Sequence, residues 1–321
     1  MNGSVCTRRS FLKGTTGLAT MAAISPMSTD VWAAGGAIPT RPLGRTGVHI
    51  PVLGLGTASL GYGLSSAQSE RIVETALDHG VTYIDTAYNY AHAQKDIGQV
   101  MKRWREKAFL ATKTHTTDGT VARLQLEESL RLLCTDYVDV VHIHSVGSLD
   151  TDRVLRPGGT LDALLKAKDE GLTRFVGISA HDFSPSLLKI LRSESIDVAM
   201  VPVHFADHET HDSEKEAFAL IEQLGIGIVG MRVFGGTKHT RPGGAKSPRL
   251  SESIMDLAFR YTLSVPGVAC AVIGVYSEEE LRQNILRAQR FVPLSASEEQ
   301  ALEEESRKLT DISNDRSIWT A

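Results

Sequence analysis

Four ionisable residues fall where neighbouring strands of a sheet would end, and together they could perform acid–base chemistry. Asp85, Lys113 and His144 each stand at, or just after, the end of a segment with a strand-like sequence, and Tyr90 follows Asp85 in the next loop. In a parallel α/β barrel, the loops after the carboxyl ends of the strands carry the chemistry. The pattern therefore predicts an active site at that edge of the sheet.

These residue types suit proton transfer. A phenol ordinarily loses its proton near pH 10. A nearby ammonium favours the phenolate and lowers that pKa, while a carboxylate keeps the ammonium charged and in place. We therefore expect Asp85 and Lys113 to pair, Tyr90 to fold back over the barrel mouth, and His144 to donate a hydrogen bond to a substrate oxygen. Taken singly, each residue is better explained as a turn former, a packing residue or a solvated side chain, but the joint placement of all four at one rim reverses that preference.

The elements that must position these residues follow from the spacing of apolar residues after residue 40. A short hairpin over residues 41–50 comes first, with a turn at 44–47. Strands are then expected at 52–56, 81–84, 108–111, 137–141, 174–178, 198–201, 226–229 and 269–273. Helices are expected at 66–79, 95–105, 120–133, 161–170, 184–191, 213–224, 251–263 and 278–290. Eight alternations predict an α/β fold, a (β/α)8 TIM barrel with an N-terminal β-hairpin. A doubly wound open sheet is disfavoured, because no Gly-x-Gly-x-x-Gly opens the first helix.

The N-terminal segment has the pattern of an export signal. Residues 7–13 read TRRSFLK and precede a weakly apolar stretch over residues 14–34. Adjacent arginines before such a stretch are typical of twin-arginine signals, and small residues favour cleavage after Ala33. We expect a cleaved signal over 1–33, a barrel domain over 40–310, export by the twin-arginine machinery and a periplasmic location. The stretch is too short and polar for a stable membrane anchor; the alternative is an amphipathic surface helix.

Composition removes some classes of function. The formal net charge of −4 argues against nucleic acid as a partner. Cys6 belongs to the expected signal, and the settings of Cys134 and Cys270 are typical of small buried hydrophobic residues rather than of a disulfide or a metal site.

The chain resembles the aldo-keto reductases. The matching segments are LGLGT at 53–57, YIDTAYNY at 83–90, ATK at 111–113, DYVDVVHIH at 136–144 and GLTRFVGIS at 171–179. The resemblance implies that Asp85, Tyr90, Lys113 and His144 are the catalytic tetrad. It also implies that Tyr90 is the general acid in reduction and the base in oxidation, with hydride passing between a nicotinamide and a small-molecule carbonyl or alcohol substrate.

The resemblance also implies a set of cofactor-binding residues, with departures from the family pattern. These residues are Thr57, Ser179, Met231, Arg232, Gly274, Glu280 and Asn284. Ala180 replaces an Asn that commonly follows Ser179, the usual Gln of the sixth strand is missing near residues 201–202, and Met231 stands where an aromatic residue usually stacks on nicotinamide. The glycine-rich, basic segment 235–246 is expected to wrap a pyrophosphate or to form a solvated loop.

The choice between NAD(H) and NADP(H) depends on the segment around the last strand. Gly274 and Glu280 occupy positions where NADPH-preferring members have a Lys and an Arg. A carboxylate repels a 2′-phosphate and can accept a hydrogen bond from a ribose hydroxyl, which tilts the expectation towards NAD(H). Both cofactors stay open, because Arg282 or Arg287 could serve a phosphate.

Two other classes of function are considered. His142, His144, His181, His204, His208 and His211 suggest a metal-dependent hydrolase or sugar isomerase on the same barrel. No cluster of carboxylates accompanies them, and Lys113 would sit badly beside a cation, so His204, His208 and His211 are interpreted as loop or substrate-pocket residues and no metal is expected. A non-catalytic nucleotide-sensing subunit is disfavoured, because the tetrad is complete.

Overall fold

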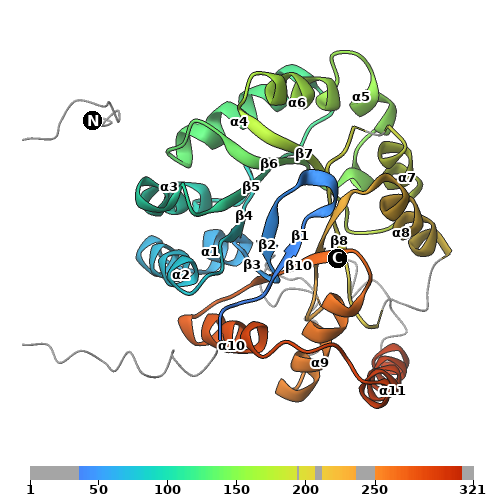
Figure 1. The fold of residues 1–321 in the computed structure, drawn as a ribbon. Coiled ribbons are helices and arrows are strands. Elements are labelled where there is room, and N and C mark those ends of the chain that lie inside the picture. The colour runs from blue at the N-terminus through green and yellow to red at the C-terminus, as the bar shows by residue number, and fades with distance from the viewer. Residues whose placement is uncertain (1–35, 194, 207–211, 236–249, 313–321) are drawn as a thin grey trace, which may run out of the picture. The chain divides into compact units, whose positions relative to one another are not determined.

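The computed structural model describes residues 36–312 apart from residues 194, 207–211 and 236–249. Eight parallel strands close into a barrel, and helices follow the strands around its outside (Figure 1). The strands, in chain order, are β3 (Leu53–Gly56), β4 (Tyr83–Asp85), β5 (Phe109–Thr114), β6 (Val138–Ile143), β7 (Thr173–Ser179), β8 (Val198–Pro202), β9 (Gly227–Met231) and β10 (Val268–Gly274). Strand β10 pairs with β3 to close the ring, so the predicted (β/α)8 fold is confirmed.

The helices also largely follow the prediction. They are α1 (Ala58–Gly63), α2 (Ser66–Asp78), α3 (Ala93–Trp104), α4 (Gly119–Leu132), α5 (Thr151–Leu155), α6 (Thr160–Asp169), α7 (Pro185–Leu191), α8 (Asp212–Leu224), α9 (Glu252–Ser264), α10 (Glu278–Gln289) and α11 (Ala296–Ile312). The prediction missed α1 and α5, since one or two turns carry too little periodicity to be recognised. It also missed α11, in which acidic residues dominate.

The N-terminal hairpin closes the bottom of the barrel. Strand β1 (Thr40–Pro42) pairs antiparallel with β2 (His49–Pro51), as expected. Leu43 and Ile50 from this hairpin join the cluster of buried residues inside the barrel. The turn is pressed against the start of β9, where a Cβ on Gly44 would lie 2.3 Å from the nitrogen of Gly227. Gly44 also has a φ of +50°, so this close approach requires glycine.

Apolar and aromatic side chains fill the barrel interior. Tyr83 and Phe109 stack with ring centroids 5.2 Å apart, and Phe175 lies 6.5 Å beyond Phe109. Cys270 is fully buried in the same cluster, as predicted, whereas Cys134 is only partly buried; both thiols are free. Burying a large apolar side chain stabilises the fold by about 1.5–3 kcal/mol, so this packing holds the strand ends in fixed positions.

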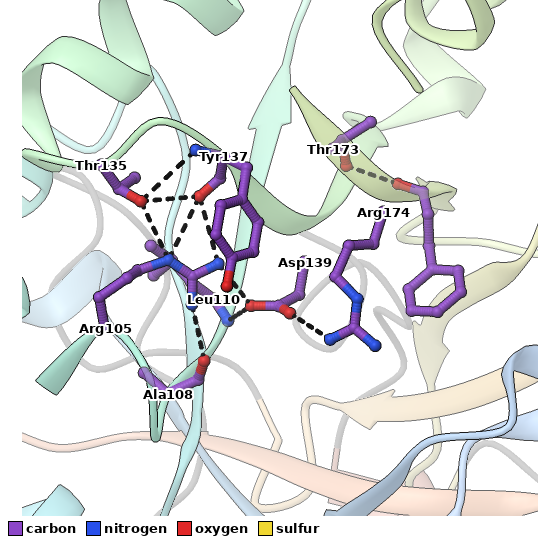
Figure 2. A network of polar contacts seen from close by, with 9 residues as sticks. Arg105, Ala108, Leu110, Thr135, Tyr137, Asp139, Thr173 and Arg174 are labelled. Atoms are coloured by element: carbon purple, nitrogen blue, oxygen red, sulfur yellow. Dashed lines mark hydrogen bonds and ion pairs between the residues drawn. The ribbon is translucent and has the colours of Figure 1, made fainter. Parts of the chain in front are cut away.

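A saturated polar network lies near the amino ends of β5, β6 and β7 (Figure 2). The buried carboxylate of Asp139 accepts hydrogen bonds from Arg105 (2.9 Å), from the backbone nitrogen of Leu110 (2.8 Å) and from Arg174 (2.7 Å). The guanidinium of Arg105 also lies 4.0 Å from the centroid of the Tyr137 ring. Because both carboxylate oxygens are bonded, this network ties three strands together at the end opposite the predicted site.

Among the described residues, no helix combines the length and the apolar character that crossing a membrane requires.

Candidate active site

Asp85 and Lys113 form a dry ion pair at the carboxyl ends of β4 and β5. The Lys113 Nζ donates to Asp85 Oδ2 (2.6 Å) and to the carbonyl oxygen of Thr86 (2.7 Å). The two side chains are only 5% and 1% exposed. The second carboxylate oxygen, Asp85 Oδ1, is buried without a hydrogen-bond partner among the described residues. The expected ion pair between Asp85 and Lys113 is therefore present, but only one of the two carboxylate oxygens accepts a side-chain hydrogen bond among the described residues.

Burial and pairing act in opposite directions on the two charges. Burial raises the pKa of Asp85 above its ordinary value, and the attraction of Lys113 only partly offsets this. Burial lowers the pKa of Lys113, but Asp85 and Tyr90 together outweigh it, so that pKa ends above its ordinary value. Lys113 therefore keeps its positive charge beneath Tyr90.

Tyr90 folds back from the loop after β4 to cover this pair. The Lys113 Nζ lies 4.9 Å from the centroid of the Tyr90 ring, and the ring meets that of His144 edge-on at 5.9 Å. Helix α1 supports the loop, since a Cβ on Gly61 would lie 2.2 Å from the carbonyl oxygen of Tyr90. The nitrogen of Ala93 donates to the same oxygen at 2.9 Å. The structure thus brings together the four residues that the sequence singled out.

The pKa of Tyr90 moves opposite to the sequence-based expectation. Burial raises it, and the repulsion between Asp85 and a phenolate adds to the rise; the positive charge of Lys113 lowers it but does not compensate. Lys113 lowers this pKa as predicted, but the expected net decrease was wrong, because the prediction left out desolvation. The phenol is therefore protonated and poised as a proton donor.

His144 follows β6 directly and is neutral. Burial first, then the positive charge of Lys113, lowers its pKa to about 2. A neutral imidazole carries one donor and one acceptor, and His144 Nδ1 is buried with no partner in the part of the chain that the structure describes. The next residue, Ser145, has a φ of +52° and donates its backbone N–H to Ser179 Oγ at 3.0 Å. Strained backbone thus occurs beside a predicted catalytic residue.

Sequence reasoning missed His115, which stands beside His144 at the rim. It follows the last residue of β5, is exposed, and donates from Nδ1 to the carbonyl oxygen of His144 at 2.9 Å. The two rings meet edge-on with centroids 5.8 Å apart. The signal was present: extending the expected strand from residue 111 to Thr114 would have placed the next side chain at the barrel mouth.

His142 lies inside the barrel, one layer below the rim. It is fully buried, and its Nδ1 donates to the carbonyl oxygen of Ile178 at 3.1 Å. Burial lowers its pKa to about 3. The His142 ring packs directly against Gly177: a Cβ at position 177 would lie 2.4 Å from His142 Nδ1. His142 is therefore a neutral core residue and does not share the position of His144.

Thr57, Ser179 and Arg232, three of the predicted cofactor residues, lie directly at the carboxyl ends of barrel strands. Thr57 Oγ1 donates to the carbonyl oxygen of Asp85 (2.9 Å), which fixes the end of β4. Ser179 Oγ accepts from Ser145, so its own proton is directed elsewhere and can donate to a ligand. Arg232 follows Met231 at the end of β9 with a φ of +59°, another strained non-glycine residue beside the predicted site.

The residues around α10 are more acidic than a phosphate site would require. Glu280 Oε2 accepts from the backbone nitrogen of Tyr276 (2.8 Å), so its carboxylate helps to cap the helix. Asn284 is buried and accepts from Arg287 (2.8 Å), while Gly274 is exposed at the end of β10. Arg282 pairs with Glu279 and Arg287 with Glu252, so both arginines considered for a phosphate already face carboxylates.

No group of three or more His, Cys, Asp or Glu side chains that could hold a metal ion occurs among the described residues. His204 is described: it is buried after β8, and its Nδ1 accepts from the nitrogen of Ala206 at 3.1 Å. His208, His211, residues 236–246 of the glycine-rich segment and the expected signal over 1–33 lie outside the described residues.

The sequence model of the Aldo/keto reductase family matches residues 52–251. The chain belongs to this family. L-galactose dehydrogenase of Arabidopsis thaliana is 24% identical over 303 residues, which cover 84% of this chain and 94% of that protein. Pyridoxal 4-dehydrogenase of Microbacterium luteolum is 23% identical, covering 79% of this chain and 94% of that protein.

Solved structures of aldo-keto reductases have the same fold. The holo form of aldo-keto reductase AKR11C1 from Bacillus halodurans is 25% identical, with a TM-score of 0.68 over 83% of this chain and 96% of that one. The Klebsiella pneumoniae aldo/keto reductase in complex with NADP and acetate is 24% identical, with a TM-score of 0.67 over 82% of this chain and 94% of that one. The protein is thus an NAD(P)-dependent oxidoreductase of the aldo-keto reductase type, and the metal-dependent alternative has no support.

Proposed function

We propose that this aldo-keto reductase interconverts a small carbonyl compound and the corresponding alcohol, with Tyr90 as the general acid and base. The observation that carries the proposal is the cluster of Tyr90, Lys113, Asp85 and His144 at one rim of the barrel, with Lys113 Nζ 2.6 Å from Asp85 and 4.9 Å from the Tyr90 ring centroid. The neutral phenol is in the protonation state that carbonyl reduction requires.

The roles of the residues follow from their charges. A nicotinamide cofactor, when bound, supplies the hydride in reduction and accepts it in oxidation. Tyr90 gives its proton to the carbonyl oxygen in reduction and takes one from the alcohol in oxidation. His144, being neutral, donates a hydrogen bond to the same oxygen. Lys113 stabilises the phenolate left behind, and Asp85 holds Lys113 in place.

Several features of the rim fit such a cofactor. The hydroxyl proton of Ser179 is available to a carboxamide, and Arg232 at the end of β9 can serve a pyrophosphate. The acidic first turn of α10, with Glu278, Glu279 and Glu280 in sequence, supports a preference for NAD(H), because carboxylates repel a 2′-phosphate. Fluorescence titration with NADH and NADPH tests this preference. Glu280→Arg should improve the binding of NADPH relative to that of NADH. If the unmodified protein binds NADPH more tightly than NADH, the preference is contradicted.

The central test is a pair of single substitutions. Tyr90→Phe removes the transferable proton and should lower turnover by about 10²–10⁴-fold, while the dissociation constant for the cofactor changes little. Ser179→Ala should weaken cofactor binding instead. Turnover by Tyr90→Phe at the rate of the unmodified protein would remove the mechanism. A panel of sugars and aldehydes would identify the substrate, and the named relatives act on L-galactose and pyridoxal.

We also propose that the protein is exported folded, with its cofactor already bound, through the twin-arginine machinery. The support is the Arg8-Arg9 pair followed by a weakly apolar stretch. Replacing both arginines with lysine should keep the protein in the cytoplasmic fraction. Denaturing freshly purified mature protein should release nicotinamide nucleotide, and a site that never binds nucleotide would contradict the proposal.

A further inference from the structure

Basic side chains occupy one half of the barrel mouth. Each of the five consecutive strands β5 to β9 is followed, one or two residues past its carboxyl end, by a histidine or an arginine. These residues are His115, His144, His181, His204 and Arg232. The equivalent positions after β10, β3 and β4 carry Val275 and Tyr276, Thr57 and Ala58, and Thr86 and Ala87. The distribution of potential charge around the mouth is therefore one-sided.

The basic side chains of this half influence one another. The pKa of His181 falls to about 4, because desolvation of its ring and the positive charges of Arg232 and Lys113 all oppose its protonation. His204 has a pKa of about 3, lowered by burial and by Arg232. Few carboxylates oppose these groups: Asp85 is paired with Lys113, and Asp182 acts on His181 without reversing the shift. His144, His181 and His204 are therefore neutral at pH 7, and the cationic side chains among these groups are Arg232 and Lys113, of which Lys113 is paired with Asp85.

We propose that His115 and His181 form a subsite for an acidic group of the substrate, a carboxylate or a phosphate, beside the position of the reacting carbonyl. The inference rests on the proposed function, which places the carbonyl oxygen between Tyr90 and His144. His115 lies directly beside that position, 5.8 Å from His144 between ring centroids. Both His115 and His181 act electrostatically on His144 from the neighbouring strand ends.

Two features of the geometry favour an anion over a neutral group. His115 uses Nδ1 to bond the His144 carbonyl, which leaves Nε2 as the other hydrogen-bonding atom of this exposed side chain. At the centre of the group, His144 Nδ1 is buried and has no hydrogen-bond partner among the described residues, as expected where a ligand completes the site. Hydrogen bonds from imidazole to a charged acceptor are stronger than those to a neutral one.

Binding of an acidic group should be coupled to proton uptake. A nearby anion favours the protonated imidazole. It should therefore raise the pKa of His181, as Asp182 does, against the lowering by Arg232 and Lys113. The affinity for an acidic substrate should therefore increase as the pH falls towards 4, the pKa of His181, and that for a neutral analogue should change less.

The test compares matched substrates with cofactor-loaded full-length protein. Succinic semialdehyde is paired with butanal, and glyceraldehyde 3-phosphate with glyceraldehyde, so the two pairs separate carboxylate from phosphate. The unmodified protein should prefer at least one acidic partner in kcat/KM. His115→Gln and His181→Gln should each reduce that preference about tenfold, the size expected for a hydrogen bond to a charged group. His49→Gln, on the exposed hairpin at the opposite end, is the matched control and should leave the preference unchanged.

Equal kcat/KM for acidic and neutral partners in the unmodified protein, or an undiminished preference in both rim variants, would overturn the subsite. If no aldehyde turns over at all, the proposed function fails separately. Calorimetric binding of succinate in two buffers of different ionisation enthalpy then decides the subsite. Binding with proton uptake that is lost in both variants supports it, and no binding overturns it.

Discussion

Two buried carboxylates at opposite ends of the barrel are bonded very differently. Asp139, near the amino ends of the strands, accepts three hydrogen bonds distributed over both oxygens. Asp85, at the carboxyl ends, accepts one from Lys113, and its Oδ1 has no partner in the described chain. Burial of a carboxylate costs free energy unless both its charge and its oxygens are compensated. The first site meets this condition, and the second does not.

The difference separates stability from function. Arg105, in the network around Asp139, also donates to the carbonyl oxygens of Ala108 and Tyr137, so this network bonds backbone groups as well as the carboxylate. In the pair of Asp85 and Lys113, one carboxylate oxygen has no hydrogen-bond partner among the described residues, and the pKa of Asp85 is raised. A saturated pair would contribute more to stability, so the Asp85–Lys113 pair is the less well compensated of the two.

The largest expected effect, a loss of turnover, comes from replacing both charged residues of the Asp85–Lys113 pair with neutral ones. Asp85→Asn combined with Lys113→Met should lower turnover by about 10²–10⁴-fold, since Tyr90 loses the charge that stabilises its phenolate. The free energy of unfolding should stay constant or rise by about 1–4 kcal/mol, because replacing both members of a buried pair removes their desolvation cost. Steady-state kinetics and urea unfolding measure the two effects, and a large loss of stability would remove the contrast.

The lower network should respond in the opposite way. Asp139→Ala leaves Arg105 buried without its carboxylate and should lower the free energy of unfolding by about 3–5 kcal/mol. Turnover per folded molecule should remain near that of the unmodified protein, because the network lies at the other end of the barrel. Urea unfolding monitored by circular dichroism, with kinetics on the folded fraction, checks this; intact stability would show that the network is not structural.

Acid should destabilise the fold through the buried histidine His142. Folded His142 stays neutral down to a pKa of about 3, whereas its ordinary value is 6.5. Between these values the unfolded chain binds more protons, so the contribution of His142 is present above about pH 6.5 and is lost as the pH falls. Between pH 6.5 and 5, the free energy of unfolding of the unmodified protein should fall by about 2 kcal/mol because of His142, at about 1.4 kcal/mol per pH unit. In His142→Gln this part of the decrease should be absent. Unfolding curves at pH 7.5, 6.5 and 5 test it, and parallel pH profiles for both proteins would refute it.

The smallest effect refines the account of the lower network. The Arg174 side chain also bonds Asp139 but is 47% exposed, whereas that of Arg105 is 10% exposed. Arg174→Gln should thus lower the free energy of unfolding by only about 0–1 kcal/mol, the range of exposed ion pairs. Thermal unfolding of Arg174→Gln beside Arg105→Gln measures the ratio, and equal losses would mean that exposure does not control these interactions.

The sequence predicted the barrel and the positions of Asp85, Lys113 and His144 because both depend on local patterns. Strand-like and helix-like spacing alternated eight times, and consecutive parallel strands place their ends at one rim. His115 was missed because the expected third strand ended at residue 111, whereas β5 reaches Thr114. Helix α1 was missed because its six residues are too few to show a helical period, and the close approach of Gly61 to the Tyr90 backbone is visible only in the structure.

By itself, the sequence determined which groups could exchange protons and on which edge of the sheet they would lie. Only the tertiary structure decided the direction in which the pKa of Tyr90 shifts, since burial outweighs the charge of Lys113. It also decided that Asp139 is saturated while Asp85 is not. Patterns of residue type fix which strands and helices form and in what order. Desolvation and hydrogen-bond completeness depend on every neighbour in space, and those neighbours come from distant parts of the chain.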